Sequence, residues 1–366
     1  MHKGCPPEAP YLGERMKVHG VLKNGGAAID ATLIHAESAE PEEVSGAAVI
    51  ESVSIQESAA DHASFILASA DGYRIKIAAS AEITWTPPLQ SLTAVKAGDW
   101  IAYKGKPDAA GVVVVTWAKL SPDIVSKSEQ DLRWRTDFDR RAASASAQRG
   151  KTRKADETDL PKPPRPYNDA AMLARITEIG DKLVPAYQLA LPDADPAKIH
   201  FRFRLVERKN LYGAMTMPSG IIFIPRHVVE RMQNDSQLAA VLADGIAGAL
   251  ERQEYRMQSK HRAAGAVAWS GLVVPYAGWG MLAGGAIGEA EISVLEREQS
   301  DRVSLGLLHD AGYDIDQAPI AWWLLSSKDQ RPITQIDLPR RAAYVYRMLG
   351  ENWHNPDANG DVFKKP

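Results

Sequence analysis

The stretch that decides the fold is Leu242 to Gln253, LADGIAGALERQ, which has the small and apolar composition of a buried helix. A glycine inside a helix costs about 1 kcal/mol relative to alanine, so tertiary packing must hold a helix that contains Gly245 and Gly248. We expect this helix to begin at a cap provided by Asp235 or Ser236. The sequence therefore predicts a helix that tertiary packing holds in place, with a groove where the two glycines lack side chains.

The same positions can be compared with the His-Glu-x-x-His spacing of zinc peptidases. Two histidines four residues apart share one helix face and can both bind zinc, while the glutamate activates the bound water. Here the three places are taken by Asp244, Gly245 and Gly248. An aspartate oxygen can bind zinc, but a glycine offers neither a ligand nor a base. The pattern predicts a helix that lacks this chemistry.

Two flanking segments carry a family resemblance. Asn210 to Ala247, NLYGAMTMPSGIIFIPRHVVERMQNDSQLAAVLADGIA, and Glu296 to Asp314, EREQSDRVSLGLLHDAGYD, resemble the HtpX and BepA group of zinc metallopeptidases, peptidase family M forty-eight. The likeness covers roughly residues 165 to 350, with both segments in the family's order. It implies a helix-rich α+β zincin-like metallopeptidase domain.

The remaining ligand positions depart from the family. Alignment on Asp301 places Arg297 where the third zinc ligand, a glutamate, is expected, although a shift of one residue would bring Glu296 or Glu298 nearby. The later segment that supplies a histidine in some relatives reads TQID at residues 334–337. We therefore expect no metal or other cofactor and a degenerate site without catalytic residues. The alternative is an active zinc metalloendopeptidase with a divergent site that uses Asp244.

The charges at two of the lost ligand positions suggest a replacement for the metal. Asp244 and Arg297 have opposite charge, so an ion pair between them would link the two helices that zinc links in the family. The alternative is that Arg297 pairs with Asp301 one turn along its own helix, which is worth only a few tenths of a kcal/mol.

Composition limits the classes of partner. The 366 residues carry 43 Lys and Arg against 46 Asp and Glu, a formal net charge of -3, which gives no reason to expect nucleic acid. A single cysteine, Cys5, excludes an internal disulfide. MHKG before it contains no apolar region, so the chain as given shows no secretory signal. The compartment stays open, and the resemblance implies a periplasmic or membrane-associated protein of the bacterial cell envelope.

Residues 16–121 follow a tail at 1–15 and predict a small all-β barrel. Their short alternating or β-branched runs include MKVHGVL, GAAVIESVSI and GVVVVTWAKL, separated by turn residues. The end of this region is similar to small OB-like barrels. A nucleic-acid surface would need basic residues beside exposed aromatics, whereas this region has an acidic excess. We expect its aromatics to pack in the barrel rather than to stack on bases: Trp85, Trp100, Tyr103 and Trp117.

The rest of the chain divides into a charged, proline-rich linker at 122–166, the metallopeptidase-like domain at 167–352 and a tail at 353–366. In the domain we expect strands at 200–207 and 220–224 and helices at 168–188, 290–309, 315–325 and 338–349. Residues 263–288 contain no charged residue. They predict a buried or membrane-surface hairpin, with a membrane span as the alternative.

The function that this pattern favours is that of a pseudo-peptidase that binds peptide or protein partners. In zincin-type folds a substrate adds as a strand along the sheet edge, which needs backbone groups rather than zinc. The expected peptide-binding edge consists of Met217, Gly220, Ile221, Ile222 and Phe223. An ordinary core strand explains the same residues. A third hypothesis gives the main role to the β domain, which would recruit the partner.

Overall fold

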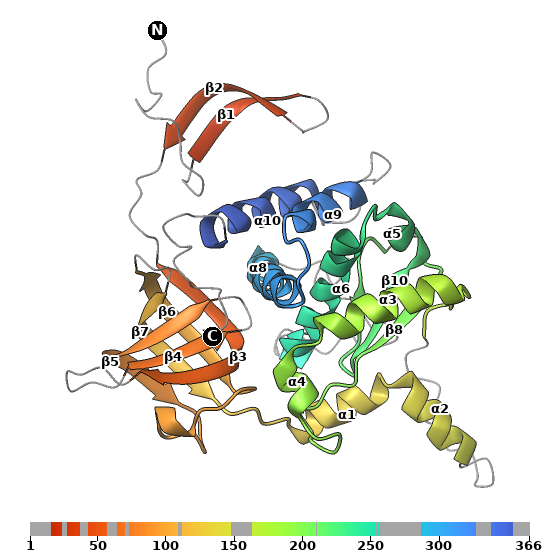
Figure 1. Cartoon of the computed structure of the whole chain (residues 1–366), viewed down its shortest axis with the longest axis horizontal. Coiled ribbons are helices and arrows are strands. Elements are labelled where there is room, and N and C mark those ends of the chain that lie inside the picture. Colours follow the sequence, from red (N-terminus) through yellow and green to blue (C-terminus); the bar gives the residue numbers. More distant parts are fainter. Residues whose placement is uncertain are drawn as a thin grey trace.

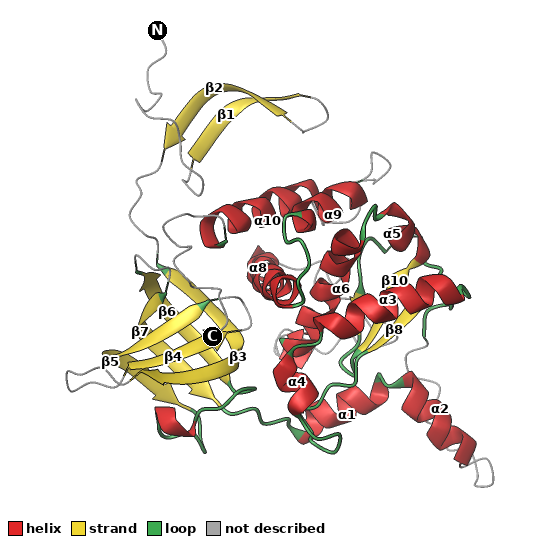
Figure 2. Ribbon diagram, in the orientation of Figure 1, coloured by secondary structure: helices red, strands yellow, loops and turns green. Residues whose placement is uncertain are grey.

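The structure is a computed structural model that describes residues 16–23, 28–36, 43–56, 64–69, 73–108, 112–147, 163–209, 211–253, 255–256, 287–326 and 338–353. It contains an all-β N-terminal part and a helix-rich C-terminal part (Figures 1 and 2). The chain is therefore multidomain, as expected.

The first two strands form a sheet of their own. β1 (Met16–Lys23) pairs antiparallel with β2 (Ala28–Ala36) and with no barrel strand among the described residues. Figure 1 shows this hairpin apart from the barrel. The predicted barrel therefore begins at Val44 rather than at Met16, and β2 is an element that the sequence pattern did not indicate.

Five strands close into a barrel in the order β3-β4-β5-β7-β6, with β6 paired back onto β3. They are β3 (Val44–Gln56), β4 (Ser64–Ser69), β5 (Arg74–Trp85), β6 (Trp100–Pro107) and β7 (Val113–Ser121), with a 3-10 turn, η2 (Leu92–Ala94), between β5 and β6. The β5–β7 pair is parallel and every other pair is antiparallel. Alternate apolar side chains fill the interior, as the period-two pattern requires.

Three of the four aromatic residues expected to pack in the barrel lie against apolar cores. Tyr103 is fully buried in the barrel and meets Tyr73 edge to face, with ring centroids 6.3 Å apart. Trp85 packs against the same core. Trp100 instead packs against the core of the helix-rich part, joined there by Val49. These contacts attach the barrel to the rest of the protein.

The segment expected to be a linker contains two helices, α1 (Lys127–Arg135) and α2 (Phe138–Ala147). α1 begins at Ser126, whose hydroxyl accepts a hydrogen bond from the backbone N–H of Glu129. Leu132 and Glu129 of α1 are buried, so this segment packs onto the protein rather than extending into solvent. The charged linker therefore contains a helix that packs against the protein on one side.

The helix-rich part surrounds a three-stranded sheet. Its strands are β8 (Arg202–Val206), β9 (Met215–Thr216) and β10 (Ile221–Pro225), in the order β8-β10-β9. β10 runs parallel to β8 and antiparallel to β9. The helices are α3 (Ala170–Leu183), α4 (Ala186–Ala190), α5 (Arg226–Arg231), α6 (Asp235–Leu250), α8 (Ile287–Asp310), α9 (Gln317–Leu325) and α10 (Leu338–Asn352).

The sheet has a different cover on each face. One face contributes Phe203, Ile222 and Ile224 to the main core, which α3, α6, α8, α9 and α10 complete. The other face carries a smaller apolar cluster, against which Phe138 of α2 packs: Val206, Leu211, Met215, Met217, Ile221 and Phe223. α6 lies at the centre of the helical layer, as Figure 1 shows.

The predicted helices and strands of this part are present, with shifted ends. The cap of α6 is Asn234, whose side chain accepts a hydrogen bond from Gln237 N at 2.9 Å, rather than Asp235 or Ser236. The helix expected at 168–188 is two helices, because the chain is extended at Val184 and Pro185 between α3 and α4. Proline cannot continue a helix that needs its N–H.

Candidate functional site

The centre of α6 is buried, and at Gly245 the groove expected beside the glycines is filled by neighbouring residues. Every residue from Gln237 to Leu250 is buried. Helices pack closely where side chains are short, so the glycines and alanines bring α6 near its neighbours. Asp244 and Gly245 lie in the middle of this buried run, and the surroundings of each determine what the site can do.

Asp244 belongs to a buried ionic cluster that joins three helices. Nη2 of Arg341, on α10, donates to Oδ1 of Asp244 at 2.5 Å and to Oδ1 of Asp301, on α8, at 2.5 Å. Nε of Arg341 donates to the same Asp301 oxygen at 2.9 Å. The guanidinium carbon lies 3.6 Å from the ring centroid of Trp322. We call Asp244, Arg341 and Asp301 the Arg341 bridge.

Electrostatics keep the Arg341 bridge charged. Burial alone lowers the pKa of Arg341, but the carboxylates of Asp244 and Asp301 outweigh it and raise the pKa above its ordinary value. The guanidinium balances the charge of two neighbouring carboxylates, as a bound metal cation can do. The bridge therefore links α6, α8 and α10 with a cation that belongs to the chain itself.

The cation predicted for Asp244 was Arg297, and the structure gives Asp244 a different partner, Arg341. The side chain of Arg297 lies outside the described residues, so the Asp244–Arg297 pair and its alternative, Arg297–Asp301, stay predictions. Asp301, which served only as an alignment anchor, is a full member of the cluster.

At Gly245, the position compared above with the general base of zinc peptidases, there is no room for a side chain. A Cβ at this position would lie 2.9 Å from the Cβ of Ala214 and 3.0 Å from Cγ2 of Ile222. The hydroxyl of Thr216 donates to the Gly245 carbonyl at 2.7 Å, which draws β9 onto α6. Because Gly245 has no side chain, the helix and the sheet are in direct contact here.

Gly248, at the place of the second histidine, lines a cleft between three elements. Its walls come from α1, from β9 with the turn after it, and from the end of α6: Glu129, Arg133, Thr216, Met217, Pro218, Gly248, Ala249, Arg252 and Tyr255. We call this the Gly248 cleft.

The expected peptide-binding residues lie in and beside the turn between β9 and β10. Gly220 has φ +87° there, a conformation that favours glycine. Ile221, Ile222 and Phe223 belong to β10, which pairs on both sides and so is not an edge. The prediction of an edge there is wrong, because an uninterrupted apolar strand needs cover on both faces and neighbours on both sides. Within the described residues, β9 borders β10 on one side only.

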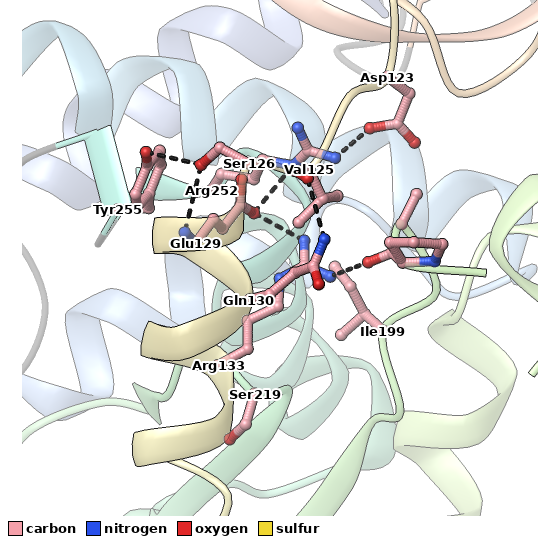
Figure 3. A network of polar contacts seen from close by, with 12 residues as sticks. Asp123, Val125, Ser126, Glu129, Gln130, Arg133, Ile199, Ser219, Arg252 and Tyr255 are labelled. Carbon is pink, nitrogen blue, oxygen red and sulfur yellow. Dashed lines mark hydrogen bonds and ion pairs between the residues drawn. The ribbon is translucent and has the colours of Figure 1, made fainter. Parts of the chain in front are cut away.

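A polar network beside the cleft was not indicated by the sequence (Figure 3). At its centre, Arg252 follows α6 with φ +52°, an uncommon conformation for a residue with a side chain. Its guanidinium pairs with Asp123 and with Glu129, and lies 5.7 Å from the ring centroid of Trp100. Burial raises the pKa of Asp123, although Arg252 opposes that shift. Arg252 therefore joins the barrel, α1 and α6.

The donors at the expected zinc position do not fit that ion. Zinc requires about three protein ligands around one point, and the two carboxylates present there already bind a guanidinium. No group of three or more His, Cys, Asp or Glu side chains arranged for a metal occurs in the described part of the chain. Residues 334–337, the last predicted ligand segment, lie outside it.

Comparison with known families adds no assignment, since no protein-family model matches this chain. The likeness to the HtpX and BepA group rests on the two sequence segments. In the described ranges, none of the helices combines the length and apolar character needed to cross a bilayer. The predicted hairpin at 263–288 lies outside these ranges, apart from the first two residues of α8.

Proposed function

We propose that this chain is a pseudo-peptidase, with a zincin-like domain of the HtpX and BepA type joined to an OB-like barrel, that binds peptide or protein partners in the cell envelope. The strand order β3-β4-β5-β7-β6, with a parallel pair at β5–β7, supports the OB-like assignment. The sheet beside α6 and the order of the two sequence segments support the zincin-like assignment.

The observation that carries the proposal is the Arg341 bridge. Asp244 and Asp301 are each about 3% exposed and share one guanidinium, so a zinc ion would have to displace a buried arginine. Removing one partner from such a cluster leaves uncompensated buried charge, at a cost of about 3–5 kcal/mol. The bridge thus gives the fold the cross-helix link of a metal site without the ability to activate water.

The first experiment measures metal content and peptidase activity together. Protein purified without added metal should contain far less than one zinc per chain by mass spectrometry and should leave casein intact. A useful comparison is Arg341→Ala, which frees both carboxylates while leaving the rest of α10 unchanged. Near-stoichiometric zinc together with chelator-sensitive cleavage in the wild type would instead establish a divergent metallopeptidase.

The backbone edge that fits the geometry is the outer side of β9, which is buried in this structure: Met215 and Met217 are 2% and Thr216 is 7% exposed. Met217 N donates to Ile221 O, so this pair is hydrogen-bonded, and the register pairs Thr216 with Ile222 next to it. In an antiparallel ladder such pairs alternate, so the N–H and C=O of Thr216 point away from β10. A peptide strand that adds there would use these two groups.

The second experiment removes one backbone donor. Reduced, carboxymethylated lactalbumin serves as a permanently unfolded probe, and its affinity is measured by biolayer interferometry. Thr216→Pro, which lacks the outward N–H, should bind the probe at least tenfold more weakly than Thr216→Val. Both variants lose the hydroxyl bond to Gly245 O, so their difference isolates the N–H. Equal affinities would show that β9 is not the docking edge.

A further inference from the structure

The helix α1 forms one wall of the Gly248 cleft, although it belongs to the segment between the two domains. Glu129 and Arg133 of α1 face Met217, Pro218 and Gly248 across it. α1 therefore lies beside the strand that we propose as the docking edge. An incoming peptide must share this space with α1 or replace it.

Polar contacts attach α1 at both of its ends. At the start, the hydroxyls of Ser126 and Ser128 lie 2.9 and 2.8 Å from the hydroxyl of Tyr255. At the end, Thr136 accepts from Ser219 twice: its hydroxyl from the backbone N–H at 3.2 Å and its carbonyl from the side chain at 2.8 Å. Figure 3 shows α1 between Tyr255 and Ser219.

The contact at the middle of α1 is ionic. The carboxylate of Glu129 lies 3.3 Å from Nε of Arg252 and 2.8 Å from Nη2 of Arg133, and its side chain is 4% exposed. Arg252 also pairs with Asp123, which lies before α1. A replacement for α1 without a carboxylate at this place would leave the buried charge of Arg252 less well compensated.

The balance of these contacts distinguishes α1 from the helices of the core. Leu132 is the only apolar side chain of α1 that is buried, at 8% exposed, whereas Trp134 is 45% exposed. A helix with few buried apolar side chains opens at a lower cost than one held by a broad apolar face, and a competing carboxylate can take over the ion pair that Glu129 makes with Arg252.

We propose that α1 is a built-in, displaceable ligand of the surface made by β9, the turn after it and the end of α6, and that the partner which replaces it is a peptide segment carrying a carboxylate for Arg252. Displacing α1 uncovers this surface, which includes the outer side of β9. The inference deepens the proposed function by naming the class of partner and the regulation of the site. It rests on that function for treating this surface as the docking site.

The test supplies α1 in trans. A fluorescent peptide with the sequence of residues 126–136 is titrated into full-length wild type, Glu129→Ala and Asp131→Ala. Asp131 is an exposed carboxylate on the same helix and is the matched control. A second peptide carries the E129Q change. Fluorescence anisotropy gives Kd for each pair.

Glu129→Ala, in which the resident helix is weakened, should bind the unmodified peptide at least tenfold more tightly than the wild type does. In the wild type the tethered helix competes with the peptide at a high effective concentration. Asp131→Ala should match the wild type. The E129Q peptide should bind Glu129→Ala at least tenfold more weakly than the unmodified peptide. The proposal would be overturned if the two peptides bound Glu129→Ala equally well, or if wild type and Glu129→Ala bound the unmodified peptide equally well. It would also be overturned if the peptide bound to no variant.

A second variant guards against a misfolded Glu129→Ala. Ser128→Ala removes from the resident helix only the hydroxyl that meets Tyr255, while the peptide keeps its own, and should give the same order of affinities with a smaller gap. The lactalbumin assay separates the two ideas. If the peptide bound but the unfolded probe was not captured, the proposed function would be rejected and the displaceable helix kept. If wild type and Glu129→Ala captured the probe equally well, the displaceable helix would be rejected and the proposed function kept.

Discussion

Replacing Arg341 is the sharpest perturbation of the fold. Its guanidinium is the shared donor to Asp244 and Asp301, and it lies against the ring of Trp322. Arg341→Met keeps much of the side-chain volume but leaves two carboxylates buried close together without their cation. We expect the free energy of unfolding to fall by about 3–5 kcal/mol, which corresponds to roughly 6–20 °C in Tm for a domain of this size.

The stability lost in Arg341→Met should be nearly the same at neutral and at moderately alkaline pH, because Arg341 stays charged over this range. The folded pKa of Arg341 is raised above its unfolded value, so the stability from its charge is fully present below the unfolded pKa. It is lost only as pH rises through the folded pKa, which lies above the ordinary range of arginine. Urea unfolding followed by tryptophan fluorescence at pH 7 and pH 9 should therefore give the same difference between wild type and variant.

Two comparisons make the measurement decisive. Arg347→Met changes an exposed arginine on the same helix and should cost less than about 1 kcal/mol. The triple change Asp244→Asn, Asp301→Asn and Arg341→Met removes all three charges and should recover much of the lost stability. If Arg341→Met were as stable as Arg347→Met, the Arg341 bridge would not be the link that holds these helices.

The remaining predictions concern the closed base position and acid stability. Gly245→Ala should lower the free energy of unfolding by about 1–3 kcal/mol in urea, despite the better helix propensity of alanine, because the new Cβ would lie 2.9 Å from that of Ala214. Burial raises the pKa of Asp137, but hydrogen bonds from Arg202 and from Arg140 N outweigh it and lower the pKa overall. Its ionised form therefore stabilises the protein above the unfolded pKa, and that contribution is lost as pH falls through the folded pKa. Asp137→Asn should be less stable than wild type at pH 7, with a difference that shrinks below about pH 4 in thermal melts.

The sequence predicts the elements of the fold because their patterns are local. The alternation in GVVVVTWAKL is confirmed as β7, and the apolar run at Gly220 to Ile224 as β10. The uninterrupted apolar character of IIFI already indicated a strand covered on both sides. The expectation of an edge strand came from the family resemblance, and this local signal contradicts it.

The partners in the site depend on tertiary contacts that no short pattern carries. The sequence indicated that Asp244 needs a cation, but that cation comes from α10, far along the chain. One signal was present: Arg341 shares a helix face with Val345 and Met348, and an arginine on an apolar stripe needs a buried acid. The contacts of Arg252 with Asp123 and Glu129 gave no comparable signal, since they follow from the way α1 packs.

The barrel topology has a consequence for synthesis on the ribosome. β7 is the last barrel strand in the chain, yet it lies between β5 and β6. Until residues 113–121 emerge, a nascent barrel presents two unpaired strand edges, which invite pairing with other chains. Slow translation just after β6 would therefore promote aggregation, whereas a pause after Ser121 would give the barrel time to close.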